Sequence, residues 1–145
     1  MLTIRPAEPA DATALTELMH ASSAYSGTYA RILEGYAITP AQLDTDIFYV
    51  ALLDDAIAGF YSLTLAGEPE LDLLFVADSA QGTGLGKTLF QHMADQARRR
   101  GLSAVKIVSH PPSVGFYQRM GATITGTQKP SAKVTWERPI LTLTL

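Results

Sequence analysis

The stretch ELDLLFVADSAQGTGLGKTLFQHMADQARRR, residues 70–100, contains the pattern that decides the fold. Its first part, residues 70–76, is apolar and predicts a strand. Residues 81–88 are rich in glycine, and apolar side chains then recur at helical spacing up to the basic residues 98–100. Gly101 predicts the end of that helix. A glycine-rich turn between a strand and a helix leaves free N–H groups where a phosphate can bind.

The segments on either side predict further strands and helices that do not alternate regularly. We expect strands over 2–4, 48–53, 56–65, 70–76, 104–108, 122–127 and 140–145. We expect helices beginning near Asp11, Tyr25, Thr39, Leu85 and Ser113. This order predicts a single α/β domain over residues 1–145, with a mixed, mostly antiparallel sheet flanked by helices.

Length and composition exclude several classes of protein. The chain has 145 residues, of which 47% are hydrophobic and 17% charged, and a net charge of −3. Such a chain can bury a core, which excludes disorder. An acidic balance disfavours nucleic-acid binding, and no apolar run approaches the ~20 residues that span a membrane. Without cysteine or a signal-peptide pattern, a cytoplasmic protein is expected.

The three histidines do not predict a metal site. His20, His92 and His110 are scattered along the chain and share no ligand spacing. We therefore expect no metal.

The glycine-rich turn partly matches two nucleotide-binding motifs. Gly86-Lys87-Thr88 fits the end of a P-loop, but Gln81 stands where that motif begins with glycine. Gly82 and Gly84 begin the dinucleotide fingerprint, but Lys87 occupies its third glycine position. Both motifs are therefore disfavoured, and a glycine-rich turn without a ligand is another alternative.

A third motif fits this turn in register. Gln81, Gly84 and Gly86 fill the pattern [Q/R]-x-x-G-x-[G/A], and residues 115–122, GFYQRMGA, contain the later pattern F-Y-x-x-x-G-[FA]. With these motifs in this order of strands and helices, the chain resembles the GCN5-related N-acetyltransferase (GNAT) family. The resemblance covers roughly residues 2–145 and implies the acyl-CoA N-acyltransferase fold of that family.

The resemblance also implies how acetyl-CoA, the cosubstrate, would bind. Its phosphates would lie on the amides of the glycine-rich turn. Its pantetheine arm would pair with the preceding strand, beside a bulge that separates this strand from its neighbour. One amide there would face the thioester oxygen. The implied cofactor-binding residues are Leu74, Phe75, Val76, Gln81, Gly82, Thr83, Gly84, Leu85, Gly86, Lys87, Ser113 and Phe116.

One position departs from the family pattern. Pro112 stands near the place where many relatives carry an asparagine that bonds the pantetheine or orders water. Proline has no N–H and no side-chain donor. The hydrogen bond must therefore be lost or come from Ser109 or Ser113.

Acetyl transfer to an amine needs a base and an acid. A primary ammonium, with a pKa near ~10.4, must lose a proton before it attacks, and the leaving thiolate must gain one. By resemblance, Tyr117 would be the acid and Glu70 the base. Asp72, on the same strand face, a water-mediated route and the absence of a base are the alternatives. Direct attack in a ternary complex is expected, because the chain has no cysteine to carry the acetyl group.

The acceptor is the least defined part of this prediction. We expect a small amine or an amino-acid-like metabolite; a protein lysine or N-terminus, and a non-catalytic acyl-CoA-binding module, are the alternatives. Tyr25, Tyr29 and Tyr36 would wall the acceptor pocket or form only a satellite aromatic cluster. The apolar C-terminal segment LTLTL, residues 141–145, is expected to be an exposed edge that pairs across a homodimer.

Overall fold

The computed structural model describes residues 1–23, 25, 27–132 and 134–145. Its centre is a seven-stranded sheet in the order β1-β2-β3-β4-β5-β7-β6. The strands are β1 (Leu2–Pro6), β2 (Ile47–Leu53), β3 (Ala56–Thr64), β4 (Glu70–Val76), β5 (Ala104–Val108), β6 (Thr123–Gln128) and β7 (Arg138–Thr144). Neighbouring strands are antiparallel except β4 and β5, which run parallel. The predicted mixed α/β fold class is therefore confirmed.

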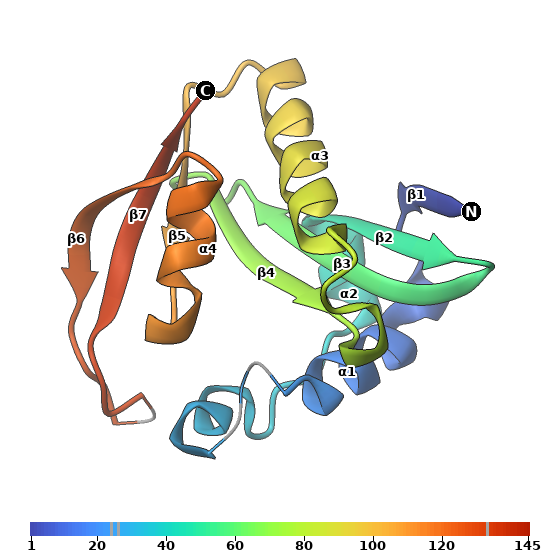
Figure 1. The fold of residues 1–145 in the computed structure, drawn as a ribbon, viewed down its shortest axis with the longest axis horizontal. Helices are drawn as coiled ribbons and strands as arrows, with labels where there is room; N and C mark the ends of the chain where they lie inside the picture. Colours follow the sequence, from blue (N-terminus) through green and yellow to red (C-terminus); the bar gives the residue numbers. More distant parts are fainter. Residues whose placement is uncertain (24, 26, 133) are drawn as a thin grey trace.

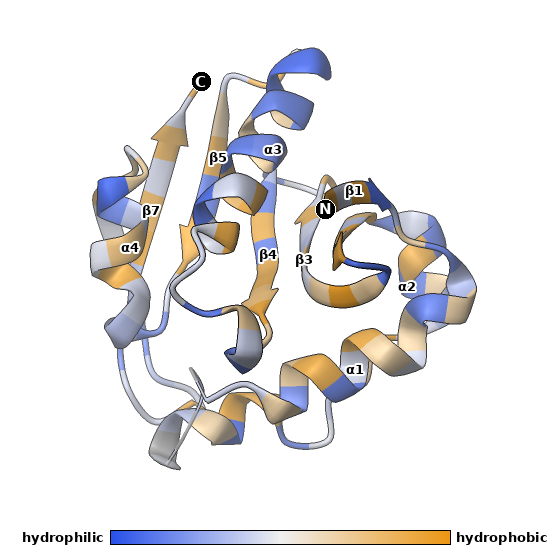
Figure 2. Cartoon of the chain, turned by 45° about the vertical axis from the view of Figure 1, so that its right-hand side comes forward, coloured by the Kyte–Doolittle hydropathy of each residue, from blue (hydrophilic) through white to orange (hydrophobic). Residues whose placement is uncertain are grey.

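Helices pack on both faces of this sheet (Figure 1). The α-helices are α1 (Ala12–Ala21), α2 (Pro40–Thr45), α3 (Leu85–Arg99) and α4 (Val114–Arg119), and the 3₁₀ helices are η1 (Pro9–Asp11), η2 (Gly27–Leu33), η3 (Asp78–Ala80) and η4 (Pro111–Ser113). One core cluster packs around α3, and a second around α1 and α2. Figure 2 shows hydrophobic residues along the strands that these helices cover. Within the described ranges, no helix is both long and apolar enough to cross a membrane.

The C-terminal strand is not an edge, so that prediction is wrong. β7 pairs with β5 on one side and with β6 on the other, which uses both of its hydrogen-bonding edges. The edges of the sheet are β1 and β6. Residues 141–145 therefore have no free strand edge that could pair with a second copy of the chain. The sequence pattern missed this because it does not encode that β7 inserts between strands earlier in the chain.

β4 changes the face that it presents in the middle of the strand. Leu73 pairs with Ser62 and Leu71 with Leu63, so Asp72 is an extra residue opposite that step, a β-bulge. Leu71 packs in the core cluster around α3, whereas Leu73 packs in the cluster around α1. In an unbroken strand both would share one face. The bulge that the family resemblance implied is therefore present at Asp72.

Beyond this bulge, β4 and β5 separate. The described ladder between them joins Glu70 with Lys106, near the start of β4. Figures 1 and 2 both show the two strands diverging toward the end of β4. The second half of β4 is thus paired on its β3 side and keeps an open backbone edge on the other.

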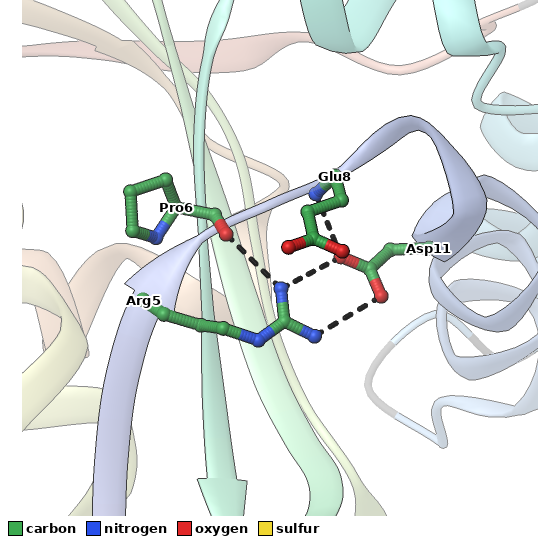
Figure 3. A network of polar contacts seen from close by, with 4 residues as sticks. All are labelled: Arg5, Pro6, Glu8 and Asp11. Atoms are coloured by element: carbon green, nitrogen blue, oxygen red, sulfur yellow. Dashed lines mark hydrogen bonds and ion pairs between the residues drawn. The ribbon is translucent and has the colours of Figure 1, made fainter.

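A bidentate ion pair fixes the entry into α1. The Arg5 guanidinium donates to both carboxylate oxygens of Asp11, at 2.9 and 3.2 Å, and to the Pro6 carbonyl at 3.0 Å (Figure 3). Asp11 also accepts from the Glu8 N–H at 2.7 Å. The hydrogen bond from Arg5 lowers the pKa of Asp11. Asp11 occupies the predicted cap position of α1, but its side chain bonds the preceding turn and not a helix amide.

Candidate functional site

A cavity of about 600 Å³ lies between the second half of β4, the glycine-rich turn and α4. The predicted cofactor residues that line it are Leu74, Phe75, Val76, Gln81, Gly82, Gly84, Leu85, Gly86, Lys87, Ser113 and Phe116. The remaining one, Thr83, lies outside the lining, and its hydroxyl donates to the Ala80 carbonyl at 2.6 Å. Tyr117, the predicted acid, lines the same cavity.

The start of α3 gives this cavity its polar character. Gly82 and Gly84 have φ values of 78° and 83°, in the left-handed region that glycine adopts without strain. Gly84 is the N-cap residue, and no side chain caps the helix. The first amides of α3 have no acceptor inside the helix and lie at the positive end of its dipole. A diphosphate is therefore the kind of group that this end of the cavity suits.

The Tyr117 hydroxyl is held as a neutral donor. Burial, and to a smaller extent the phenol of Tyr25, raise the pKa of Tyr117 above its ordinary value of 10.0. Its ring packs 5.3 Å from that of Phe116 and 6.1 Å from that of Phe90, centroid to centroid. Among the described residues, the hydroxyl has no hydrogen-bond partner. It can therefore give a proton to a bound molecule, and it is not a base near neutral pH.

Of the two serines considered in place of the family asparagine, one lines this cavity. Ser113, at the end of η4, is part of the lining beside Pro112. Ser109 is buried, and its hydroxyl donates to the His110 carbonyl at 2.8 Å. Of the two serines, Ser113 is thus the one that lies at this cavity.

A second cavity, of about 150 Å³, lies on the other side of β4. Its lining is Tyr25, Ile32, Leu33, Tyr36, Glu70, Asp72, Leu73, Phe75, Val108 and Arg138. The bulge explains this set, because Asp72 and Leu73 follow each other in sequence and yet reach the same cavity. Phe75 lines both cavities, so the two spaces lie next to each other along β4.

Both candidate bases lie in the second cavity. Burial raises the pKa of Glu70, and the neighbouring Asp72 raises it further, while Lys106 and Arg138 oppose the shift. Burial also raises the pKa of Asp72, with a smaller contribution from Asp46. Two carboxylates that hold protons more tightly than usual are suited to accept a proton from an ammonium group.

The aromatic residues of the irregular segment divide into two groups. Tyr25 and Tyr36 line the second cavity. Tyr25 lies 5.3 Å from Phe75 and stacks on His110 at 4.1 Å, centroid to centroid. Tyr29 lies outside that lining and packs edge-on against His110. Two of the three tyrosines therefore wall the cavity, and the third supports them.

Two residues near the second cavity escaped prediction from the sequence. Arg138 lines the cavity from the first position of β7, whereas the sequence pattern predicted a strand beginning only at residue 140. Trp136 packs edge-on against Tyr29 at 5.1 Å. The segment that carries both residues has no hydrophobic periodicity. A lone tryptophan and a lone arginine were therefore the signals that the sequence offered there.

In the described ranges, no group of three or more His, Asp or Glu residues could hold a metal ion.

A model of the acetyltransferase (GNAT) family matches residues 14–122 of the chain. The chain belongs to the GNAT family. The matched range includes β4, the glycine-rich turn and Tyr117, so the resemblance read from those motifs is confirmed.

Individual relatives and solved structures agree with this assignment. The chain is 35% identical over 81 residues to a 5-NmdU N-acetyltransferase of Pseudomonas phage PaMx11, covering 54% of this chain and 58% of that protein. It is 38% identical over 79 residues to the peptidyl-lysine N-acetyltransferase YjaB of Salmonella typhimurium, covering 54% of this chain and 51% of that one. The chain thus matches little more than half the length of these GNAT relatives.

The GNAT fold also recurs among solved structures. The PaiA N-acetyltransferase of Thermoplasma acidophilum, determined in complex with coenzyme A, aligns with a TM-score of 0.79 at 18% identity. The alignment covers 100% of this chain and 99% of that one. At this level of identity, the likeness establishes the shared fold.

Proposed function

We propose that the chain is an acetyl-CoA-dependent N-acetyltransferase that acetylates the primary amine of a small molecule by direct attack in a ternary complex. The observation that carries this proposal is that two unlike cavities lie next to each other along β4 and share Phe75 in their linings. One is large and ends at a helix N-terminus. The other is small and contains two carboxylates.

The larger cavity fits coenzyme A in three respects. The amides of Gly82 and of residues 84–87, in the glycine-rich turn and the first residues of α3, suit the diphosphate. The open edge of β4 over 74–76 suits the amide groups of the pantetheine arm, which can extend the sheet as a strand would. Ser113 offers a hydroxyl where Pro112 has replaced the usual donor. The complex of PaiA with coenzyme A, in the same fold, supports this assignment.

The proposed chemistry divides the proton transfers between two residues. Glu70, with Asp72 or an ordered water as the alternatives, accepts a proton from the acceptor's ammonium group. The freed nitrogen attacks the thioester carbonyl, a C–N bond forms, and the C–S bond breaks. Tyr117 donates its proton to the departing sulfur and recovers one from the nitrogen or from solvent. Acetyl-CoA and an ammonium thus give an acetamide, coenzyme A and one proton.

The dimensions of the second cavity favour a small acceptor. Its volume is about a quarter of that of the larger cavity, 150 against 600 Å³. The two relatives are named for different acceptors, 5-NmdU and peptidyl-lysine, so their names do not choose one for this chain. We therefore propose a small amine or amino-acid-like metabolite.

Calorimetric titration of the purified protein with acetyl-CoA, coenzyme A and Mg-ATP tests the first step. Saturable binding of acetyl-CoA without a Mg-ATP signal is expected. A panel of amines is then screened by release of the free thiol. Failure to bind acetyl-CoA would refute the proposal. Binding without thiol release for any amine would instead favour a non-catalytic acyl-CoA-binding module.

A further inference from the structure

Arg138 has an unusual position among the described residues of the second cavity. It is the one cation in a lining that also contains Glu70, Asp72 and two phenols. Its Nε is buried and has no hydrogen-bond partner in the part of the chain that the structure describes. The ion pairs recorded within 4.0 Å involve other residues, so neither cavity carboxylate is bonded to the guanidinium.

A guanidinium that is partly buried and has no ion-pair partner in the protein is suited to bind an anion from outside the protein. Removing a charged group from water is costly unless it is paired and hydrogen-bonded. The planar fork of arginine matches a carboxylate with two parallel N–H donors, which a lysine ammonium does not. Arg138 lines the cavity, and within the described ranges no hydrogen bond or ion pair engages its guanidinium, so the guanidinium is available to a carboxylate inside that cavity.

The charges of the cavity are separated in a way that matches a zwitterion. Glu70 and Asp72 come from β4 and suit an ammonium, whereas Arg138 comes from β7 and suits an anion. Arg138 still acts on Glu70 through space, because its charge opposes the rise in the pKa of Glu70. Opposite charges thus lie within a cavity of about 150 Å³ without neutralising each other in an ion pair.

We propose that Arg138 binds a carboxylate of the acceptor, and that the acceptor is therefore an amine that also carries a carboxylate, such as an α-amino acid. This inference rests on the proposed acetyl transfer and makes Arg138 a specificity-determining residue for it. The ammonium end faces Glu70 and Asp72, and the carboxylate end faces Arg138. A lysine side chain within a protein brings no carboxylate next to its ammonium and does not satisfy this arrangement.

Tyr25 supports the carboxylate end of the cavity. Burial raises the pKa of Tyr25 to about 12, although the charge of Arg138 opposes the rise. The phenol therefore stays neutral near physiological pH. It adds a hydrogen-bond donor beside Arg138 and no competing negative charge.

The test compares free L-amino acids with their α-carboxamides, which have nearly the same shape but no negative charge. Thiol release is measured for each pair with the unaltered protein and with Arg138→Gln. We expect kcat/KM to favour the acids by about 10- to 100-fold, the range of a hydrogen bond to a charged group. Arg138→Gln should bring the ratio of kcat/KM for the acid to kcat/KM for the carboxamide close to one, with acetyl-CoA affinity unchanged. Loss of the Arg138 charge also acts on Glu70, and that effect changes both members of a pair alike.

Two further variants keep this test decisive. Arg98→Gln removes a cation that pairs with Asp95 on α3, and it should leave the preference unchanged. Arg138→Lys keeps the charge but not the fork, and an intermediate preference is expected; it replaces Arg138→Gln if that variant does not fold. The ratio of kcat/KM for the acid to kcat/KM for the carboxamide in the unaltered protein is itself a test, which needs no variant.

Failure of the inference is distinguishable from failure of the proposed function. If acetyl-CoA binds and carboxamides or lysine peptides react as well as the free acids, the role of Arg138 is overturned while acetyl transfer stands. If no pair reacts, the Kd values of the acids and of the carboxamides are measured with the protein loaded with coenzyme A. Equal Kd values, or no binding of either compound, overturn the role of Arg138. Absence of acetyl-CoA binding refutes the proposed function itself.

Discussion

Tyr117 lies in a position where removal of one oxygen atom can separate binding from chemistry. The ring packs against Phe116 and Phe90, and Tyr117→Phe keeps those contacts. We expect kcat to fall by about 10²- to 10⁴-fold, the usual contribution of a positioned acid. The Kd for acetyl-CoA should stay within a factor of about three. Thiol release and calorimetry measure the two quantities, and an unchanged kcat would remove Tyr117 from the mechanism.

The two carboxylates of the second cavity can be separated by a matched pair of variants. If Glu70 is the base, Glu70→Gln should lower kcat/KM by about 10²-fold or more, and Asp72→Asn should have a much smaller effect. Asp72→Asn removes one of the charges that raise the pKa of Glu70. The reverse ranking would assign the base to Asp72.

The pH profile gives an independent readout for the same base. A base works in its ionised form, and burial raises the pKa of Glu70 above its ordinary value of 4.5. The acid limb of kcat/KM should therefore lie above pH 4.5 in the unaltered protein. In Asp72→Asn it should move to lower pH, because a repelling charge is gone. An unmoved limb in that variant would mean that another group sets it.

At the level of single residues, the sequence located those that belong to a motif. Tyr117 and the glycines were found because the order of residues around them is fixed by a turn and a helix start. Glu70 was predicted from the family resemblance, by counting back from Gln81 to the position where some family members have a glutamate, and the structure places it in the lining of the second cavity. Arg138 was missed because it contributes through the place of β7 beside β5, which its neighbours in sequence do not encode.

The start of α3 is the element whose backbone shape matters most to the proposed cofactor site. Gly84→Ala places a Cβ at φ 83°, which costs roughly 1–2 kcal/mol, and disturbs the amides that face the cavity. Gly101→Ala is a matched control, since Gly101 ends the same helix with φ 76° and lies outside the cavity. Both variants should lose similar stability in chemical denaturation. Only Gly84→Ala should weaken acetyl-CoA binding, and equal binding by both would contradict an anion site there.

The junction of β1 with α1 should make stability depend on pH. The pKa of Asp11 is lowered in the folded state by the hydrogen bond from Arg5. Its stabilisation is therefore complete above the ordinary value of 3.8 and is lost as pH falls through the lower folded value. Asp11→Asn should cost about 1–2 kcal/mol at pH 7 and less in acid. Asp55→Asn, in the exposed hairpin turn, is the control in urea denaturation.

At the level of elements, the sequence predicted which segments form strands and helices better than how they join. The boundaries of β4 and β5 were predicted as observed, because apolar runs and turn residues delimit them. The position of β7 between β5 and β6 was missed, since periodicity reports burial and not neighbours. The bulge at Asp72 was known only through the family resemblance, because one extra residue leaves no mark in a single sequence.

The position of the two cavities next to each other predicts the kinetic order of the proposed acetyl transfer. Both substrates must be present together for a nitrogen in one cavity to reach a thioester in the other. Initial-rate plots at several acceptor concentrations should therefore intersect, and no acetylated protein should be isolated from a mixture with acetyl-CoA alone. Parallel lines with a stable acetyl-protein adduct in mass spectrometry would contradict direct attack.

At the scale of the whole molecule, the fold and family could be predicted and the acceptor could not. The family is readable because its motifs lie close together in sequence, within 81–122. The second cavity, the proposed acceptor site, is assembled from η2, the tyrosines Tyr25 and Tyr36 on either side of it, and the strands β4, β5 and β7, which only the folded chain brings together. No local pattern could have combined them.

The single extra residue in β4 has a consequence for how such a protein can acquire new substrates. After Asp72, Leu73 lines the small cavity, Leu74 and Val76 line the large one, and Phe75 lines both. Under the proposed function, neighbouring positions of one short strand thus serve different molecules. Mutations at Leu73 should then remodel acceptor preference while Leu74 keeps the proposed cofactor contact, so the two specificities can drift independently within a segment of four residues.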